Sequence, residues 1–558
     1  MKQKFPKLFL YLLGALFLLN IVQSFFTELI YDEAYYWYYA QNLAWGYFDH
    51  PPIVALLIKI SGFFFNGELG VRLMSCVLSV GTVVLLWLLI DHEKKKSYII
   101  HFFLLLFAMP LFNVYGFLTL PDTPLLFFTA LFLLVYKNFL KQSTIVNAIL
   151  LGLAMAALMY SKYNAVLVIF FVLLSNLKLL KNKHAWLAVI VSLLAYSPHF
   201  LWLYNNDFVT IEYHLFERPN QAYTFEGFTL GYLLNLIINF GLIFPFAYWA
   251  IFKRKAGGTF NKALLYLSYG IIAFFLLSSF QRRTQTQWVI VLCIPMAILT
   301  YEYLLNNTKS RKWIYRLAVI SFFLLLIGRI GLAYEPLFPV SYETHGNKEW
   351  VTNLKSQIGD IPVVFENSYR RSPMYQFYSG GINTFSLNNI HYRQNQYSID
   401  SSEEKVQGKK IAYISKYIKK GDFKYYNRKG TEFKGYYIEN FESFRKLRCY
   451  TDYDIIKLSA TDLDLDLKIY NPYSVNIPLE NIKIRVGYLN AYKQLEETQT
   501  INYSPAQIST TFLKAKDTTY FKYSLPKPKK EDLKYLKFSI SENGLQTGIN
   551  SQSYKIER

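Results

Sequence analysis

Charged residues, cysteines and glycine-rich nucleotide motifs are scarce or absent in this sequence of 558 residues. Only 17% of the residues are charged and three are cysteine, whereas 53% are hydrophobic and 18% are aromatic. This apolar content excludes an intrinsically disordered chain, and the length together with three cysteines excludes a small disulfide-stapled scaffold. Neither a P-loop motif nor a GxGxxG motif suited to a nucleotide is present, so the usual glycine-rich phosphate-binding loops are excluded as well.

Acidic residues are also few, because 38 Asp and Glu stand against 59 Lys and Arg, which gives a net charge of +21. Such a basic excess is typical of nucleic-acid-binding proteins. Here many of the positive residues lie in short loops between long apolar runs, as expected for the cytoplasmic loops of a membrane protein. We therefore expect membrane lipid around the chain and no nucleic-acid partner.

Long apolar runs fill residues 1–340, whereas residues 341–558 have the composition of a soluble domain. A helix needs about 20 apolar residues to cross a bilayer. By that measure the sequence predicts about 11 spans, at 8–27, 68–90, 98–116, 122–137, 145–161, 163–180, 185–204, 229–252, 263–280, 287–305 and 313–333. The stretch 51–65 is shorter and follows two prolines, so we expect it to lie at the membrane interface. The predicted fold class is mainly α, a polytopic bundle of membrane helices.

Lys and Arg are divided unequally between the two sets of alternate loops. With the amino terminus included, one set holds 19 of these residues and the other holds seven. Because basic short loops stay inside the cell, the amino terminus is predicted to be cytoplasmic. An odd number of spans then places residues 341–558 outside the cytoplasm, and the first span is expected to remain as an anchor.

The first loop on the predicted outer side contains Asp32-Glu33 directly after a span and Asp49-His50 before two prolines. Adjacent carboxylates suit general-base chemistry, in which one takes a proton while its neighbour orients it, and they also suit metal binding. For Asp32 a helix-capping role is an equally good interpretation. The aromatic residues at 35–37 fit a membrane-interface belt better than a sugar-stacking surface.

Further ionisable residues fall at or near the outer ends of other predicted spans. Asp122 suits either a helix cap or a polar site, and Lys162 suits either a snorkelling side chain or a phosphate contact. His214 is either a solvated loop residue or a metal ligand. Arg282 and Arg283 suit bidentate phosphate binding or interfacial anchoring. Because charges of both signs converge from separate loops, we favour a polar cavity at the outer face.

These motifs, in their order along the chain, resemble a known family. The segments that carry the resemblance are Asp32-Glu33, Asp49-His50-Pro51-Pro52, Gly70-Val71-Arg72 and Pro121-Asp122-Thr123-Pro124-Leu125. They resemble polyprenyl-phosphate-dependent glycosyltransferases of the C fold class, in the branch of protein O-mannosyltransferases and lipid A aminoarabinose transferases. The resemblance covers roughly residues 10–300. It implies an inverting transfer of a sugar from a polyprenyl-phosphate carrier, at the outer face of the membrane, to an extracytoplasmic acceptor.

The resemblance also implies roles for single residues. Asp32, beside Glu33, matches the catalytic acidic position and would deprotonate the acceptor hydroxyl. Asp49 matches a carboxylate that binds a divalent metal ion in the aminoarabinose branch, with His214 as its partner. Asp122 matches a further acidic position of the site, and Arg72 belongs to the matching motif.

Four residues are candidates for the phosphate of the donor. His50 stands where the aminoarabinose branch has a lysine that touches phosphate, and an imidazole is a weaker partner for it. Lys162, Arg282 and Arg283 are expected to stabilise the leaving phosphate, on the basis of their charge and predicted side of the membrane. Apart from the metal ion, no cofactor is expected.

The tail has no predicted span and many Tyr, Lys, Asn and Ser residues. Short apolar runs at 361–365 and 410–414, with a helix near 370–378 between them, predict a small α/β domain over 341–455. Alternating runs at 467–470, 482–486, 519–523 and 536–540 predict a β-sandwich over 456–558. Two of the three cysteines lie in predicted spans, so no disulfide is expected.

The sequence thus predicts a multi-pass glycosyltransferase of the cell (inner) membrane that uses a polyprenyl-phosphate sugar. Protein, lipid A and another glycan all remain open as acceptors. The main alternative is a lipid-linked glycan transporter or flippase without catalysis, which should place ionisable groups through the membrane depth. Transfer of a whole oligosaccharide is less favoured because the tail lacks a WWD motif, and a polytopic anchor that only displays the tail is the remaining alternative.

Overall fold

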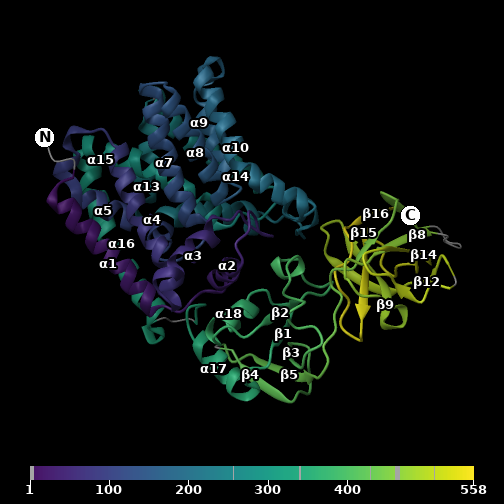
Figure 1. Cartoon of the computed structure of the whole chain (residues 1–558). Helices are drawn as coiled ribbons and strands as arrows, with labels where there is room; N and C mark the ends of the chain where they lie inside the picture. The colour runs from purple at the N-terminus through teal and green to yellow at the C-terminus, as the bar shows by residue number, and fades with distance from the viewer. Residues whose placement is uncertain are drawn as a thin grey trace. The chain divides into compact units, whose positions relative to one another are not determined.

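The computed structural model covers the whole chain and describes residues 5–255, 257–337, 341–427, 429–458, 465–507 and 509–557 (Figure 1). It divides into two compact units. One consists of Met1–Asn205 and Tyr223–His345 and is called the helical unit below. The other consists of Asn206–Ala222 and Gly346–Arg558 and is called the strand-rich unit. A short piece of chain between two helical segments therefore belongs to the unit formed by the tail.

The helical unit contains eight helical segments long and apolar enough to cross a membrane, within the described residues. They are α1 (Lys7–Phe26), α4 (Gly67–Leu89), α7 (Asp122–Lys141), α10 (Lys183–Asn205), α12 (Gly231–Phe240) continued by α13 (Phe244–Lys253), α14 (Thr259–Ser278), α15 (Cys293–Asn306) with the 3₁₀ turn before it, and α16 (Thr308–Ala333). Each corresponds to a predicted span. The chain is thus a mainly helical, multi-pass membrane protein with a strand-rich tail.

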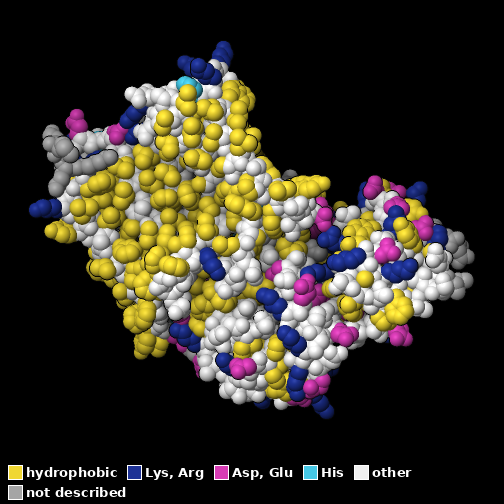
Figure 2. All heavy atoms as spheres, viewed as in Figure 1, with side chains coloured by type: hydrophobic (Ala, Val, Ile, Leu, Met, Phe, Trp, Pro, Cys, Tyr) yellow, Lys and Arg dark blue, Asp and Glu magenta, His cyan; other side chains and the backbone are white. Residues whose placement is uncertain are grey.

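The buried fraction of these helices differs between the centre and the outside of the bundle. In the segment Thr286–Asn306, 89% of the apolar window is buried inside the protein, whereas in α1 only 22% is buried. The outward side chains of α1 and α10 are large and apolar, and Figure 2 shows a continuous hydrophobic surface over the helical unit. Soluble proteins rarely expose an apolar patch of this size to water, so this surface is expected to face lipid.

The other predicted spans form shorter helices. The predicted span 98–116 is interrupted, because α5 (Ile99–Phe107) ends before Pro110 and α6 (Pro110–Val114) starts anew. Proline lacks the N–H that would continue the helix, which explains the break. The two spans predicted at 145–161 and 163–180 are α8 (Ile145–Ser161) and α9 (Ala165–Leu174). The predicted interfacial stretch is α3 (Ile53–Phe64), preceded by α2 (Tyr31–Gln41).

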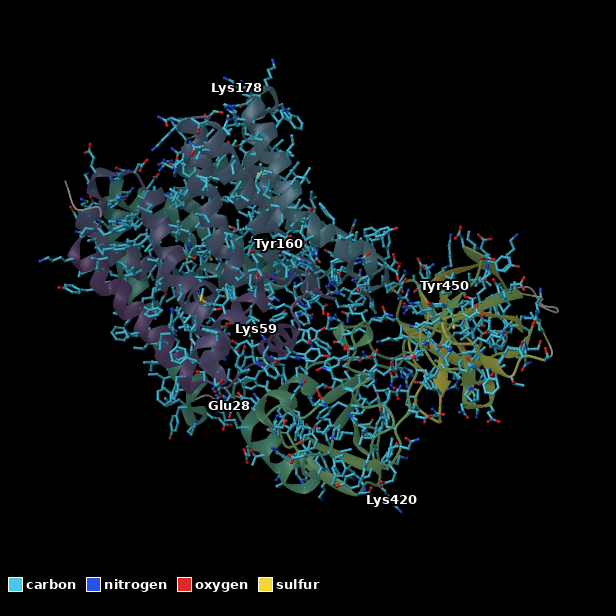
Figure 3. All side chains as sticks on the ribbon, viewed as in Figure 1. Glu28, Lys59, Tyr160, Lys178, Lys420 and Tyr450 are labelled. Carbon is cyan, nitrogen blue, oxygen red and sulfur yellow. The ribbon has the colours of Figure 1, made fainter. Side chains whose placement is uncertain are left out.

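The helical unit has two opposite ends, marked by Glu28 and Lys178 in Figure 3. Glu28 follows the last residue of α1, and Lys178 lies in a 3₁₀ turn between α9 and α10. They are called the Glu28 end and the Lys178 end below. The acidic pair after α1 lies at the Glu28 end, next to the residue that marks it.

The strand-rich unit begins with α17 (Asn347–Ile358) and a five-stranded sheet. Its strands are β1 (Val363–Glu366), β2 (Thr384–Leu387), β3 (Ile411–Ser415), β4 (Phe423–Tyr426) and β5 (Glu432–Ile438), in the order β2-β1-β3-β5-β4. The first three are parallel and fully buried, and α18 (Arg371–Tyr378) connects β1 to β2. The predicted strands and helix of the α/β region are present.

The rest of the tail forms two packed sheets that are antiparallel except for the parallel pair β16 and β7. One has the order β11-β10-β15-β16-β7 and the other β12-β14-β8-β6. The strands are β6 (Arg448–Tyr450), β7 (Ile455–Lys457), β8 (Leu465–Tyr470), β10 (Ile482–Asn490), β11 (Leu495–Thr500), β12 (Asn502–Pro505), β14 (Thr518–Ser524), β15 (Leu533–Glu542) and β16 (Tyr554–Glu557), beside a small pair, β9 (Ile477–Pro478) and β13 (Phe512–Leu513). Apolar side chains from both sheets share one core, as in a β-sandwich. All three cysteines are free and buried.

Residues 206–222 are held in the strand-rich unit by Glu217, whose side chain is 11% exposed. Glu217 forms ion pairs with Lys493 at 3.0 Å and Lys537 at 2.6 Å, and its second oxygen accepts a hydrogen bond from the Ser553 hydroxyl at 2.8 Å. Burial alone raises the pKa of Glu217, but the two lysines and the hydrogen bonds outweigh burial and lower that pKa from 4.5 to about 2. The segment is therefore held mainly by charge.

This contact predicts an acid-sensitive attachment. Because Glu217 loses its proton more easily in the folded chain than in the unfolded one, its stabilisation is complete above about pH 4.5 and is lost as the pH falls towards 2. Glu217→Gln should cost up to about 3 kcal/mol at neutral pH and make the segment less sensitive to acid. Urea titrations read by hydrogen exchange within 206–222, at pH 6 and pH 3.5, measure both effects. Glu480→Gln, at an exposed position of the same unit, is the control and should match the wild type.

Candidate functional site

The acidic pair after α1 occupies the first turn of α2. Glu33 is fully buried and forms a two-point ion pair with Arg72 of α4, with N–O distances of 2.8 Å from Nε and 2.5 Å from Nη2. It also accepts hydrogen bonds from the backbone N–H groups of Ile30 at 3.2 Å and Thr119 at 2.9 Å. The helix-capping contact that the sequence left open for Asp32 is thus made by Glu33.

Besides its ion pair with Glu33, Arg72 binds the backbone at the end of α1. Its guanidinium donates hydrogen bonds to the backbone carbonyls of Ser24, Thr27 and Glu28, so it holds the end of α1 as well as the start of α2. A buried ion pair with all its hydrogen bonds made is rigid. The position of Glu33 fits a structural role better than a proton-accepting one. Asp32, which is half-buried in the same helical turn, is left as the acid of the pair with access to solvent.

Asp122 and Lys162 are brought together. Asp122 begins α7 and is 3% exposed, and Lys162 follows the end of α8 and is 8% exposed. The Lys162 Nζ lies 2.7 Å from Asp122 Oδ1. The sequence offered a helix cap or a polar site for Asp122 and a snorkelling side chain or a phosphate contact for Lys162. It did not pair them, and the two form a nearly buried ion pair between neighbouring helices.

Tyr115 connects the two ionic groups at this end. It lies between α6 and α7, and its hydroxyl is within electrostatic range of both Asp122 and Asp32. Thr119 lies in the same connection between α6 and α7, and its N–H donates to Glu33. The backbone that leads to Asp122 therefore also contacts the Glu33–Arg72 pair. Thr119, three residues before Asp122, thus links the helical turn that carries Asp32 to the Asp122–Lys162 pair. The polar site at this end stays a prediction.

Asp49 is held by tyrosines of α2. The hydroxyl of Tyr35 donates to Asp49 Oδ2 at 3.1 Å and the hydroxyl of Tyr39 at 3.5 Å. Tyr39 in turn stacks on Tyr47, with ring centroids 4.2 Å apart. The ring of His50 packs edge-on against Tyr36 at 5.5 Å. Four tyrosines of α2 are buried and support this segment from within instead of forming an exposed belt, namely Tyr35, Tyr36, Tyr38 and Tyr39.

The predicted metal pair is divided between the units, since Asp49 belongs to the helical unit and His214 to the strand-rich unit. Within the described ranges, no group of three or more His, Cys, Asp or Glu side chains is arranged to hold a metal ion. Asp49 already accepts hydrogen bonds from phenol groups. This donor set does not fit a metal site, and a divalent ion at Asp49 stays a prediction.

Arg282 and Arg283 lie in the turn between α14 and the segment that leads into α15. Arg282 is half-buried and its N–H binds the Ser278 carbonyl at 2.9 Å. The side chain of Arg283 is exposed and forms no ion pair with any residue in the part of the chain that the structure describes. This arginine is thus available to a ligand at the surface.

One part of this end was not predicted as part of the site. Arg329 of α16 is 2% exposed and donates to the side-chain oxygens of Asn20 at 2.7 Å, Asn113 at 3.3 Å and Gln23 at 3.4 Å. Gln23 also donates to the Thr27 hydroxyl at 2.7 Å, and the Thr27 carbonyl binds Arg72. The signal in the sequence was the presence of amide side chains within the first apolar span.

Comparisons with known proteins show to which proteins the chain is similar. The family described as dolichyl-phosphate-mannose-protein mannosyltransferase matches residues 49–202. A lipid A galacturonosyltransferase, RgtD of Rhizobium johnstonii, is 24% identical over 297 residues, which cover 49% of this chain. The chain spans 60% of the length of that relative.

Solved structures share the fold. The crystal structure of ArnT from Cupriavidus metallidurans in the apo state aligns with a TM-score of 0.50 and 15% identity, over 73% of this chain and 92% of that chain. The structure of the same protein bound to undecaprenyl phosphate aligns with a TM-score of 0.51, 14% identity and the same coverage. The predicted resemblance to glycosyltransferases of the C fold class is confirmed.

Proposed function

We propose that this protein is a membrane glycosyltransferase that moves a sugar from a polyprenyl-phosphate carrier to an acceptor hydroxyl with inversion. The family matched by residues 49–202 and the galacturonosyltransferase relative support the reaction class. The undecaprenyl phosphate bound to ArnT supports the carrier, and the lipid A in the name of RgtD supports a glycolipid as acceptor. We place the protein in the cell (inner) membrane, with the amino terminus cytoplasmic and the tail extracytoplasmic.

The observation that carries this proposal is that one short stretch of backbone, from Thr119 to Asp122, binds Glu33 beside Asp32 and carries the carboxylate of the Asp122–Lys162 pair. Inverting transfer needs a carboxylate to activate the nucleophile and a cation to stabilise the leaving group. Asp32 supplies the first and Lys162 the second, at one end of the helical unit. A transporter would need ionisable groups distributed through the membrane for alternating access.

The chemistry follows from these positions. The acceptor oxygen attacks the anomeric carbon of the sugar, the bond from that carbon to the phosphate oxygen breaks, and Asp32 takes the hydroxyl proton. Lys162 stabilises the charge that develops on the leaving phosphate, while Asp122 keeps its ammonium group in place. Arg282, Arg283 and His50 are further candidates for contacts to this phosphate. Glu33 and Arg72 hold the first turn of α2, and thereby Asp32.

The test is a transfer assay on purified protein with defined polyprenyl-phosphate sugars and a lipid A acceptor. The wild type should transfer one of these sugars, and Lys162→Met should lower turnover by about 10²-fold because one stabilising charge is lost. Lys162→Met leaves Asp122 buried without its cation, so the double variant Asp122→Asn/Lys162→Met serves to restore folding without restoring turnover.

A matched control is Lys178→Met, which removes an exposed cation at the Lys178 end of the helical unit and should keep wild-type turnover.

The wild-type protein in proteoliposomes distinguishes the enzyme from the flippase. If the lipid-linked sugar moved across the bilayer without transfer to any acceptor, the protein would be a flippase and not a glycosyltransferase. Wild-type turnover in Lys162→Met would remove Lys162 from the reaction.

A further inference from the structure

The parallel part of the five-stranded sheet presents a distinctive edge. Strands β2, β1 and β3 lie side by side in that order, and their carboxyl ends meet at one edge (Figure 1). From β1 the chain passes to β2 on one side, and from β2 it returns to β3 on the other. In sheets of this order, ligands bind beyond the carboxyl ends where the connections diverge. The residues after β1 and β2 therefore lie where this sheet order places a ligand.

The loops after β1 and β2 are fastened to each other. Asn367, directly after β1, has a positive φ of 55° and donates its N–H to the Leu387 carbonyl at 3.0 Å. Its side-chain oxygen accepts the N–H of Asn389 at 2.9 Å. The Ser368 N–H donates to the Ser386 hydroxyl at 3.2 Å. The two loops thus form one rigid edge, which positions the residues that follow.

Three arginines follow these contacts, namely Arg370 and Arg371 after β1 and Arg393 after β2. Burial raises the pKa of Tyr392, and the charges of all three arginines act against that rise, so they lie within electrostatic range of one hydroxyl. The group of Arg370, Arg371, Arg393 and Tyr392 is called the arginine edge below. A group of arginines at one edge gives this edge a positive potential that attracts an anion.

The aromatic surroundings give this edge a second property. The Arg393 guanidinium lies 4.8 Å from the ring centroid of Tyr213 and 5.0 Å from that of Tyr369. The Tyr369 and Tyr392 rings are 6.1 Å apart. Tyr213 comes from the segment 206–222, next to His214, so this segment completes the edge. Aromatic rings beside cations suit a ligand with both a ring and an anionic group.

Arg371 is the most available cation of the edge. It is half-buried, its guanidinium lies 3.8 Å above the Phe433 ring, and its N–H binds the Ser368 hydroxyl. Across the described residues, this guanidinium forms no hydrogen bond or ion pair. A planar guanidinium held on a ring keeps its N–H groups free for bidentate contact with a phosphate.

We propose that the arginine edge binds the phosphorylated sugar head group of the acceptor. This inference rests on the proposed function and deepens it, because it assigns acceptor recognition to the strand-rich unit. The arginines would contact the phosphate, and the tyrosines would pack against the sugar ring. The edge would then select phosphate-bearing glycans and leave chemistry to the helical unit.

Binding is measured by isothermal titration of the full chain in a neutral detergent, with N-acetylglucosamine 1-phosphate, N-acetylglucosamine and inorganic phosphate as probes. The sugar phosphate should bind at least tenfold more tightly than inorganic phosphate, and the uncharged sugar should not bind detectably. Added salt should weaken the interaction. Equal binding of inorganic phosphate would overturn the sugar contact, and no binding by any probe would overturn the site.

Arg371→Met should weaken sugar-phosphate binding at least tenfold, and Arg371→Lys should restore part of it. Lys534→Met, an exposed cation of β15 in the same unit, should bind as the wild type does. Unchanged binding in Arg371→Met would contradict the proposal. Asp32→Asn should bind normally, because this assay needs no turnover. Binding without transfer by the wild type would reject the proposed enzyme alone, and transfer without binding would reject the arginine edge alone.

Discussion

Asp32→Asn should lower sugar transfer by about 10²- to 10⁴-fold while the protein remains folded, because an amide cannot take the proton of the acceptor hydroxyl. Asp32 is half-buried in the first turn of α2, and Glu33 supports this turn through its hydrogen bond from the Ile30 N–H and its ion pair with Arg72. The substitution therefore removes the base without removing the support of the helix. Initial rates with a saturating polyprenyl-phosphate sugar, together with the elution profile in detergent, measure the two effects.

Two variants sharpen this prediction. Asp32→Glu keeps a carboxylate on a longer side chain and should recover part of the rate that Asp32→Asn loses. Glu226→Gln removes an exposed acid from the same unit and should leave the rate unchanged. A rate for Asp32→Asn within twofold of the wild type would mean that another group activates the acceptor.

Arg72→Met should be the most damaging single substitution for folding at the Glu28 end. It leaves Glu33 fully buried without a counter-charge and removes the donors to three backbone carbonyls. Removing one partner of a buried ion pair typically costs about 3–5 kcal/mol. We expect a large loss of folded protein and a lower midpoint of thermal unfolding, measured by the yield of monodisperse protein and by thermal aggregation.

The double variant Arg72→Met/Glu33→Gln should fold better than Arg72→Met alone, because no buried charge is left unpaired. Lys309→Met, at an exposed position of the same unit, is the matched control and should unfold like the wild type. If Arg72→Met folded normally and lost only turnover, Arg72 would be a substrate contact and not a structural one.

The sequence predicted the helical architecture well where length and hydropathy decide it. The eight long apolar segments were predicted because a run of about 20 apolar residues has few other folds. The segment 98–116 was predicted less well, because its hydropathy concealed the effect of Pro110 on the helix. In the tail, the buried strands were predicted from their apolar runs. Strands β4 and β6 were not predicted, because they are three or four residues long and only alternate side chains are buried.

The candidate site was predicted by residue type but not by partner. Glu33 and Arg72 are 39 positions apart, and Asp122 and Lys162 are 40 apart, so no local pattern pairs them. The sequence consequently left Glu33 as a catalytic candidate and Lys162 as either a phosphate contact or a snorkelling side chain. Arg329 was not predicted as a site residue, because its partners are neutral amides from α1 and α6.

The inclusion of Asn206–Ala222 in the strand-rich unit has a consequence for the design of shortened chains. The polypeptide passes from one unit to the other at 205–206, 222–223 and 345–346. A truncation before Gly346 would leave Glu217 without the lysines and the serine that neutralise and bind it. The tail therefore cannot be removed or exchanged by itself. Grafting it onto a related transferase would require residues 206–222 of this chain to be transferred as well.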